Sequence, residues 1–134
     1  MKLTQFSDCH LTYCTNIHPG ESWQQVWAHF QTYLPAVKRA VSPHQDFGVG
    51  ARLSAKAVTE LLQGNNLAQL QAWLKASGLY VFTINGFPYG QFHQKKVKEN
   101  VYLPDWSAIA RLEYSKLLAQ ALAELLPTDC IGTI

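Results

Sequence analysis

The chain has 134 residues, of which 48% are hydrophobic and 15% are charged, and its formal net charge is +2. This apolar content is enough for the core of one domain, whereas the weak and scattered positive charge argues against nucleic acid as a partner. No stretch approaches the roughly 18 apolar residues that span a membrane, and the first residues lack the apolar segment of a signal peptide, so we expect no membrane span.

The cysteines indicate the compartment. Cys9, Cys14 and Cys130 form no CxxC pair, and an odd number of cysteines in a chain without a signal peptide is typical of reduced thiols. We therefore expect a cytoplasmic protein without disulfide bonds. The lysine cluster within residues 95–98 is interpreted as part of a solvated loop.

The first predicted unit is a strand followed by a long helix. Residues 11–17 form a run rich in Thr, Tyr and Cys that ends at His-Pro-Gly, which predicts a strand and then a turn. Ser22, with Gln25 three residues later, matches a capping box at the start of a helix. Apolar residues recur at helical spacing until Pro43, so we expect this helix to bury a broad aromatic face.

The second predicted unit contains a strand and two shorter helices. Residues 47–53 predict the strand, and Ser54 is placed to cap the helix that follows. The Gly-Asn-Asn sequence at 64–66 interrupts the helical pattern, and we expect Asn66 to cap the second piece. Gly78 is expected to end that piece.

The third unit begins with a clear strand signal at residues 79–84, which are apolar on both faces as in a buried parallel strand. A long loop over residues 85–104 follows, and loops of this length are usually binding loops or lids. Asp105 is expected to cap the last helix. A fourth strand is expected to start at Cys130.

These elements predict an α/β fold with parallel strands and right-handed crossovers. Such a sheet either stays open, as in doubly wound folds, or curls into a barrel, and periodicity does not choose between them. The chain lacks the GxGxxG, GxxxxGK(S/T) and GxSxG motifs, so nucleotide-binding and serine-hydrolase functions lose their usual markers. The strand that starts at Cys130 is not completed within the chain, and a (β/α)8 barrel needs about 250 residues. We therefore expect the N-terminal part of a barrel, whose unpaired strand edges would favour self-association.

Both candidate folds place ligands at the carboxyl ends of the strands, so polar residues after the strands are candidate site residues. Asn16 and His18 lie at the end of the first strand. The imidazole of His18 titrates near neutrality and both donates and accepts hydrogen bonds, which suits a metal ligand, a general base or a hydroxyl-binding group. The alternative is a histidine that only fixes the turn before the capped helix.

Two further positions are candidates for ligand binding. Arg52 lies in an otherwise apolar strand, where it either forms a structural ion pair or binds an anionic or polyhydroxylated ligand. Asn85, Phe87 and Tyr89 follow the third strand and supply an amide and two aromatic rings, which suit neutral polyols and sugars. Alternatively, Phe87 and Pro88 only close a turn over the core.

Residues 10–23, 48–54, 82–90 and 97–106 together resemble the EboE family of metabolite-traffic proteins, and the resemblance covers nearly the whole chain. It implies the N-terminal half, about three and a half βα units, of a xylose-isomerase-like (β/α)8 TIM barrel. It also implies that the protein handles a small molecule, a secondary metabolite or its precursor.

The resemblance leaves the chemistry open. In xylose-isomerase-like enzymes the ligands of the divalent metal come largely from the later strands of the barrel, so a divalent metal is implied for a full barrel and no metal ligand is assigned in this chain. The alternative to metabolite handling is a metal-dependent sugar or sugar-phosphate isomerase or epimerase. A third alternative is a complete flavodoxin-like domain with an interaction role, which requires the fourth strand to lie at a sheet edge.

Overall fold

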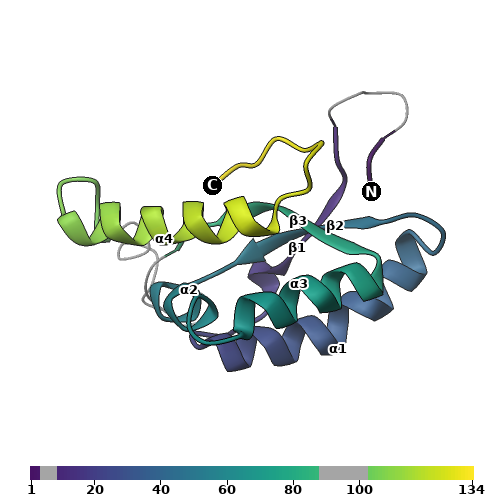
Figure 1. The fold of residues 1–134 in the computed structure, drawn as a ribbon, viewed down its shortest axis with the longest axis horizontal. Helices are drawn as coiled ribbons and strands as arrows, with labels where there is room; N and C mark the ends of the chain where they lie inside the picture. Colours follow the sequence, from purple (N-terminus) through teal and green to yellow (C-terminus); the bar gives the residue numbers. More distant parts are fainter. Residues whose placement is uncertain (4–8, 88–102) are drawn as a thin grey trace.

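The computed structural model describes residues 1–3, 9–87 and 103–134 and has an α/β fold (Figure 1). Its sheet contains β1 (Thr12–Cys14), β2 (Phe47–Arg52) and β3 (Leu79–Asn85). Both strand pairs are parallel, and the order is β1-β2-β3. The expectation that successive strands are parallel neighbours in chain order is therefore confirmed, and the doubly wound order, with the first strand in the middle, is wrong.

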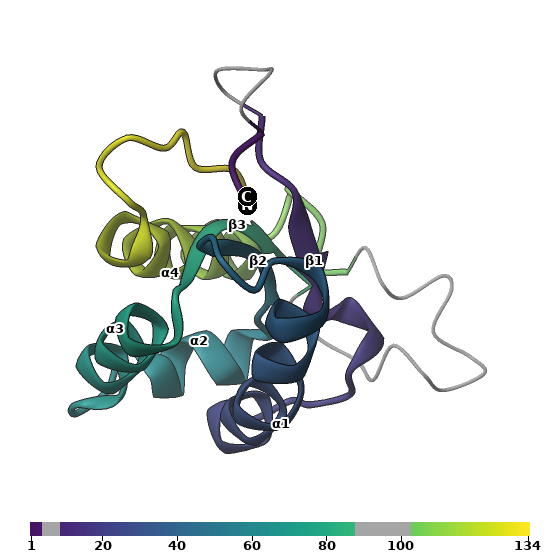
Figure 2. The ribbon, with the colours of Figure 1, turned by 90° about the vertical axis from the view of Figure 1, so that its right-hand side faces the viewer.

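Four α-helices of the described chain pack on the same side of this sheet (Figure 2). They are α1 (Trp23–Val41), α2 (Ala55–Leu61), α3 (Asn66–Ser77) and α4 (Ile109–Leu125). Alternate strand residues, among them Val49 and Val81, are fully buried and form one core with apolar residues of all four helices. When strands that are neighbours in chain order are joined by right-handed crossovers, every helix lies on the same side of the sheet. This rule explains why the four helices share one side.

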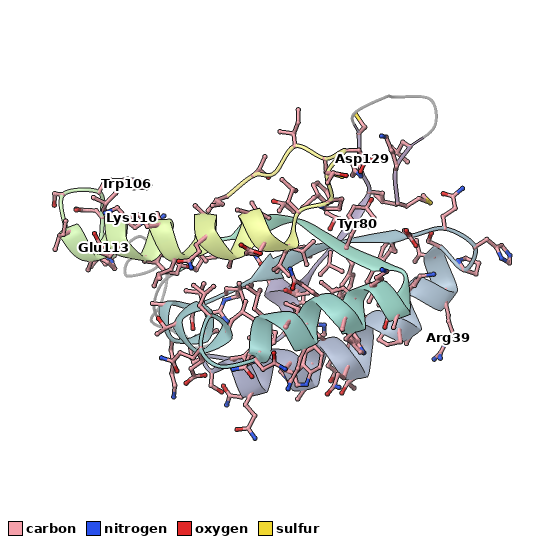
Figure 3. All side chains as sticks on the ribbon, viewed as in Figure 1. Arg39, Tyr80, Trp106, Glu113, Lys116 and Asp129 are labelled. Carbon is pink, nitrogen blue, oxygen red and sulfur yellow. The ribbon has the colours of Figure 1, made fainter. Side chains whose placement is uncertain are left out.

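The other side of the sheet carries no helix in the described part of the chain (Figure 2). Tyr80 and Phe82, which alternate with the buried residues of β3, are only half-buried there. Figure 3 shows Tyr80 and Asp129 above the sheet, opposite α1 and α3. We call this side, with Tyr80 and Phe82, the open face. The parallel pairing that the apolar sequence of β3 predicted is confirmed, while its open-face residues are only half-buried.

The close approach of β2 to its neighbours depends on Gly48. A Cβ atom there would lie 2.9 Å from both the Leu11 carbonyl oxygen and the Phe82 ring. The Phe82 ring thus occupies the space that a side chain at position 48 would need. On the open face, the large Phe82 side chain of β3 therefore lies over Gly48 of β2.

The segment after α4 returns to the sheet beside β3. The Ile84 amide donates to the Thr133 carbonyl at 3.0 Å, and the Thr133 amide donates to the Phe82 carbonyl at 3.1 Å. This bridge is parallel. The chain therefore reaches the position of a fourth strand at Thr133, three residues after the predicted start at Cys130.

Helix ends were predictable where the capping residue acts on its own helix. Ser22 and Gln25 form the reciprocal capping box, and Ser54 accepts from the Ala57 amide. Gly78 ends α3 in the left-handed conformation with φ 61°. These three cap predictions are confirmed.

Two other cap predictions are wrong because each side chain bonds elsewhere. Asn65 is the N-cap of α3, whereas the side-chain amide of Asn66 donates to the Glu60 carbonyl at 2.8 Å and so bonds the last turn of α2. Asp105 accepts from the Ser107 amide and hydroxyl, which stabilises a turn, and α4 starts only after Ala108.

The first strand is also shorter than the predicted span 11–17. Residues Thr15–Ile17 form a 3-10 turn. The Thr15 hydroxyl donates to the Gly50 carbonyl at 3.2 Å and accepts from the Arg52 amide at 2.9 Å. A side chain thus replaces the backbone pairing that would have continued β1.

None of the helices in the described ranges has the length and apolar content needed to cross a lipid bilayer.

Candidate functional site

The carboxyl ends of β1, β2 and β3 bring several polar residues to one edge of the sheet. Arg52 and Asn85 are register partners, and Cys14 pairs in register with Gly50. The Asn85 amide donates to the Cys14 sulfur at 3.2 Å, which joins the two outer strands across the end of β2. We call Cys14, Arg52 and Asn85 the carboxyl-edge cluster. Two of its members were predicted as site residues.

Arg52 is held by the turn that precedes α1. Its side chain is buried, and its two terminal nitrogens donate to the Gly20 carbonyl at 2.7 Å and to a Glu21 carboxylate oxygen at 2.9 Å. The Ser54 hydroxyl donates to the Glu21 carbonyl at 2.6 Å. The sequence allowed either a structural ion pair or ligand binding for Arg52, and the ion pair is present. It holds the turn before α1 against the end of β2.

His18 lies against α1 in a cluster of aromatic rings. Its Nε2 atom is 3.0 Å from the Tyr13 hydroxyl, and its ring stacks on Tyr33 with centroids 4.2 Å apart. The ring of His29 lies 5.5 Å away. Burial, and then the neighbouring His29, lower the pKa of His18, so the neutral ring is favoured.

A small cavity separates His18 from Arg52. Its lining includes Thr15, His18, His29 and Arg52, and its volume is about 10 Å³. That volume holds about one water molecule and no larger ligand. His18 therefore shares a cavity wall with Arg52, while its own ring contacts are to Tyr13 and α1.

The structure gives fewer contacts for the remaining predicted residues, Asn16, Phe87 and Tyr89. The Asn16 side-chain oxygen is buried and has no hydrogen-bond partner among the described residues. Phe87 is partly buried two residues after β3. Tyr89, with most of the predicted loop 85–104 and the lysine cluster within 95–98, lies outside the described residues. The expectation that Tyr89 lies close to His18 and Asn85, because all three follow strand ends, stays a prediction.

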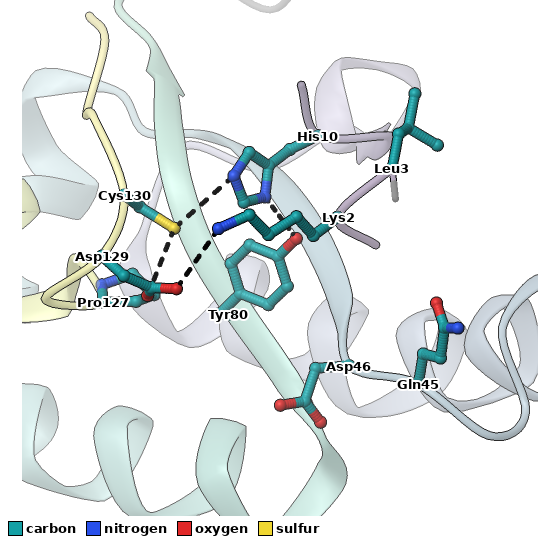
Figure 4. Close-up of a pocket in the computed structure, with 9 residues that line it drawn as sticks. All are labelled: Lys2, Leu3, His10, Gln45, Asp46, Tyr80, Pro127, Asp129 and Cys130. Carbon is teal, nitrogen blue, oxygen red and sulfur yellow. Dashed lines mark hydrogen bonds and ion pairs between the residues drawn. The ribbon is translucent and has the colours of Figure 1, made fainter. Parts of the chain in front are cut away.

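A much larger cavity lies at the opposite, amino-terminal edge of the sheet (Figure 4). It has a volume of about 540 Å³, within the usual range for small-molecule sites. We call it the amino-edge pocket, and the residues that define it are Lys2, His10, Asp46, Tyr80, Asp129 and Cys130. None of the predicted site residues that the structure describes lines it.

Sequence reasoning missed this pocket because its walls come from separate segments. They are the first residues, the loop before β2, the start of β3 and the segment after α4. Each polar residue looks like an ordinary surface residue in its own segment. The rule that directs attention to carboxyl ends also points away from this edge.

Among the described residues, no three His, Cys, Asp or Glu side chains are grouped so that they could hold a metal ion. The three cysteines are free thiols. The chain matches no protein-family model, and the searches of curated proteins and of solved structures returned no match.

Proposed function

We propose that this chain forms the N-terminal part, about three and a half βα units, of a xylose-isomerase-like (β/α)8 barrel. In such a barrel each strand pairs with the next one in the chain, and the helices form an outer ring. The order β1-β2-β3, the helices on one side and the bridge at Thr133 all agree with that pattern.

The open face supports the same proposal. Barrel interiors are filled in layers by side chains from alternate strands. Phe82 on β3 covers Gly48 on β2, so one strand fills a layer and its neighbour leaves room. Half-buried Phe82 would become an interior residue once further strands covered it.

The function that we propose is EboE-type handling of a small polyhydroxylated molecule in the cytoplasm. The carboxyl-edge cluster is the observation that carries it. The Cys14 thiol and the Asn85 amide, which contact each other, lie with Arg52 of the strand between them at the edge where barrel proteins bind ligands. Asn85 can donate and accept, as hydroxyl groups require.

Binding of xylose and xylitol to the isotopically labelled chain, followed by NMR, tests this function. We expect saturable shifts of the amide signals of Cys14, Arg52 and Asn85. The change Asn85→Leu should weaken binding about tenfold, because a lost hydrogen bond costs about 1–1.5 kcal/mol. Asn65→Ala is the matched control, since Asn65 is exposed and its side chain makes no cap bond.

Equal affinity of the Asn85→Leu variant and the unchanged chain would contradict the proposed site. Shifts confined to the amino edge would place the ligand elsewhere. An unchanged dispersed amide spectrum of each variant shows that a loss of binding does not come from unfolding.

A further inference from the structure

The amino-edge pocket is built around one aromatic ring. Tyr80 lies at the start of β3, and its hydroxyl is 2.8 Å from His10 Nδ1 (Figure 4). The His10 ring also lies 5.0 Å from the ring of Phe82. Burial, followed by electrostatic interactions with Cys130, Asp46 and Asp129, raises the pKa of Tyr80 to about 12. The Tyr80 phenol is therefore neutral at physiological pH.

Two carboxylates lie beside this ring. Asp129 meets Lys2 at 3.6 Å, with both side chains well exposed at 71% and 48%. An exposed ion pair of this kind contributes little, so a ligand cation can replace Lys2. Asp46 makes no hydrogen bond or ion pair with the described residues, but two ammonium groups act on its carboxylate from nearby. One is the Met1 terminus, and the other is Lys38 on α1, which also donates to the Ser42 carbonyl at 3.2 Å.

The ionised acceptors of the pocket are therefore the carboxylates of Asp46 and Asp129. Ionised carboxylates only accept, and a ligand that matches them must donate. The face of a tyrosine ring attracts an organic cation, and its edge packs against an apolar body. Lys2 already shows that a primary ammonium is accommodated beside Asp129 (Figure 4).

We propose that the amino-edge pocket binds a small organic cation, a primary amine on an apolar or aromatic body, through Asp46, Asp129 and the ring of Tyr80. The pocket is at the opposite edge from the carboxyl-edge cluster. The proposal rests on the cavity and its charges, and it stands whether or not the polyol function is correct.

Phenethylamine and 2-phenylethanol test the proposal with the chain as it is. The two probes have the same ring and length, and only the first carries a charge near pH 7. We expect saturable binding of phenethylamine with a Kd of about 1 mM, typical of a fragment-sized ligand, and shifts of the Tyr80 and His10 signals. Phenylethanol should bind at least roughly fivefold more weakly, as loss of a partly exposed cation contact implies.

The carboxylates are tested by Asp46→Asn and Asp129→Asn, each of which should weaken the amine about threefold to tenfold and leave phenylethanol unchanged. Glu113→Gln is the control, because Glu113 is an exposed carboxylate on α4, far from Tyr80 and Asp129 (Figure 3). Equal binding of the two probes, an equal loss in the Glu113 variant, or absence of saturation would overturn the proposal. Shifts confined to Cys14 and Asn85 would instead place amine binding at the other edge.

Discussion

Replacing Arg52 by methionine separates its structural role from a role in ligand binding. Methionine keeps a long unbranched stem, so packing at the end of β2 changes little. The change removes the guanidinium that donates to the Gly20 carbonyl and the Glu21 carboxylate. If these bonds fix the turn before α1, the variant must lose stability.

The size of the loss follows from burial. Removing one partner of a buried ion pair costs about 3–5 kcal/mol when the other charge stays buried. The Glu21 side chain is 30% exposed, whereas that of Arg52 is 3% exposed. Because the Glu21 carboxylate can regain water, we expect Arg52→Met to lower the free energy of unfolding by about 2–3 kcal/mol. Glu21→Gln, which keeps a neutral acceptor, should cost about 1 kcal/mol.

Urea unfolding followed by tryptophan fluorescence measures these values, and the double variant gives the coupling, expected at about 1 kcal/mol. The control is Lys116→Met, which breaks an exposed pair of the same 2.9 Å length with Glu113 and should cost less than about 0.5 kcal/mol. If Arg52→Met costs no more than this control, the reasoning fails. Loss of xylitol binding at unchanged stability would assign Arg52 to the ligand.

Three further predictions concern stability and assembly. Tyr114→Phe should cost about 1–2 kcal/mol in urea unfolding, because the buried Leu53 carbonyl loses its hydroxyl donor, whereas Tyr33→Phe on the surface of α1 should be neutral. The lowered pKa of His18, caused by burial and His29, means that its contribution to stability is present above about pH 6.5 and is lost as pH falls through the folded pKa. Unfolding at pH 7.5 and 5 should therefore show a smaller pH dependence for His18→Gln than for the unchanged chain, and an equal dependence would contradict this. The unpaired sheet edge and open face should make the chain self-associate, so light scattering after size exclusion should give a mass above 15.1 kDa, and a monomer with a sharp melt would count against the barrel proposal.

Local signals in the sequence were reliable where a residue acts within its own segment. The capping box at Ser22, the cap at Ser54 and the left-handed Gly78 depend on neighbours three or four residues away. The alternation of strands and helices predicted parallel strands, since right-handed crossovers leave few topologies, but the chain order of the strands followed only from the barrel interpretation. The prediction failed where two neighbours compete for one task, as Asn65 and Asn66 do between α2 and α3.

Contacts between distant segments could not be predicted. Tyr114 was not expected in the core, and its hydroxyl bonds a carbonyl 61 residues earlier in the chain. The amino-edge pocket needs four segments in place before its carboxylates and its ring meet. At the other edge, the sequence predicted Arg52 and Asn85 from their positions at strand ends, but the Cys14 contact depends on the register of three strands.

The chain-order pairing of the strands has a consequence for synthesis on the ribosome. Gly48 pairs with Thr12, and Leu79 pairs with Phe47, so each strand that leaves the exit tunnel meets a partner made shortly before it. Chains generally fold from the N-terminal end as they are made, and pairing of this kind needs no later strand to be inserted between earlier ones. The sheet can therefore grow at a single edge, with each helix closing over the unit just completed, and that growing edge passes from β3 to the segment at Thr133.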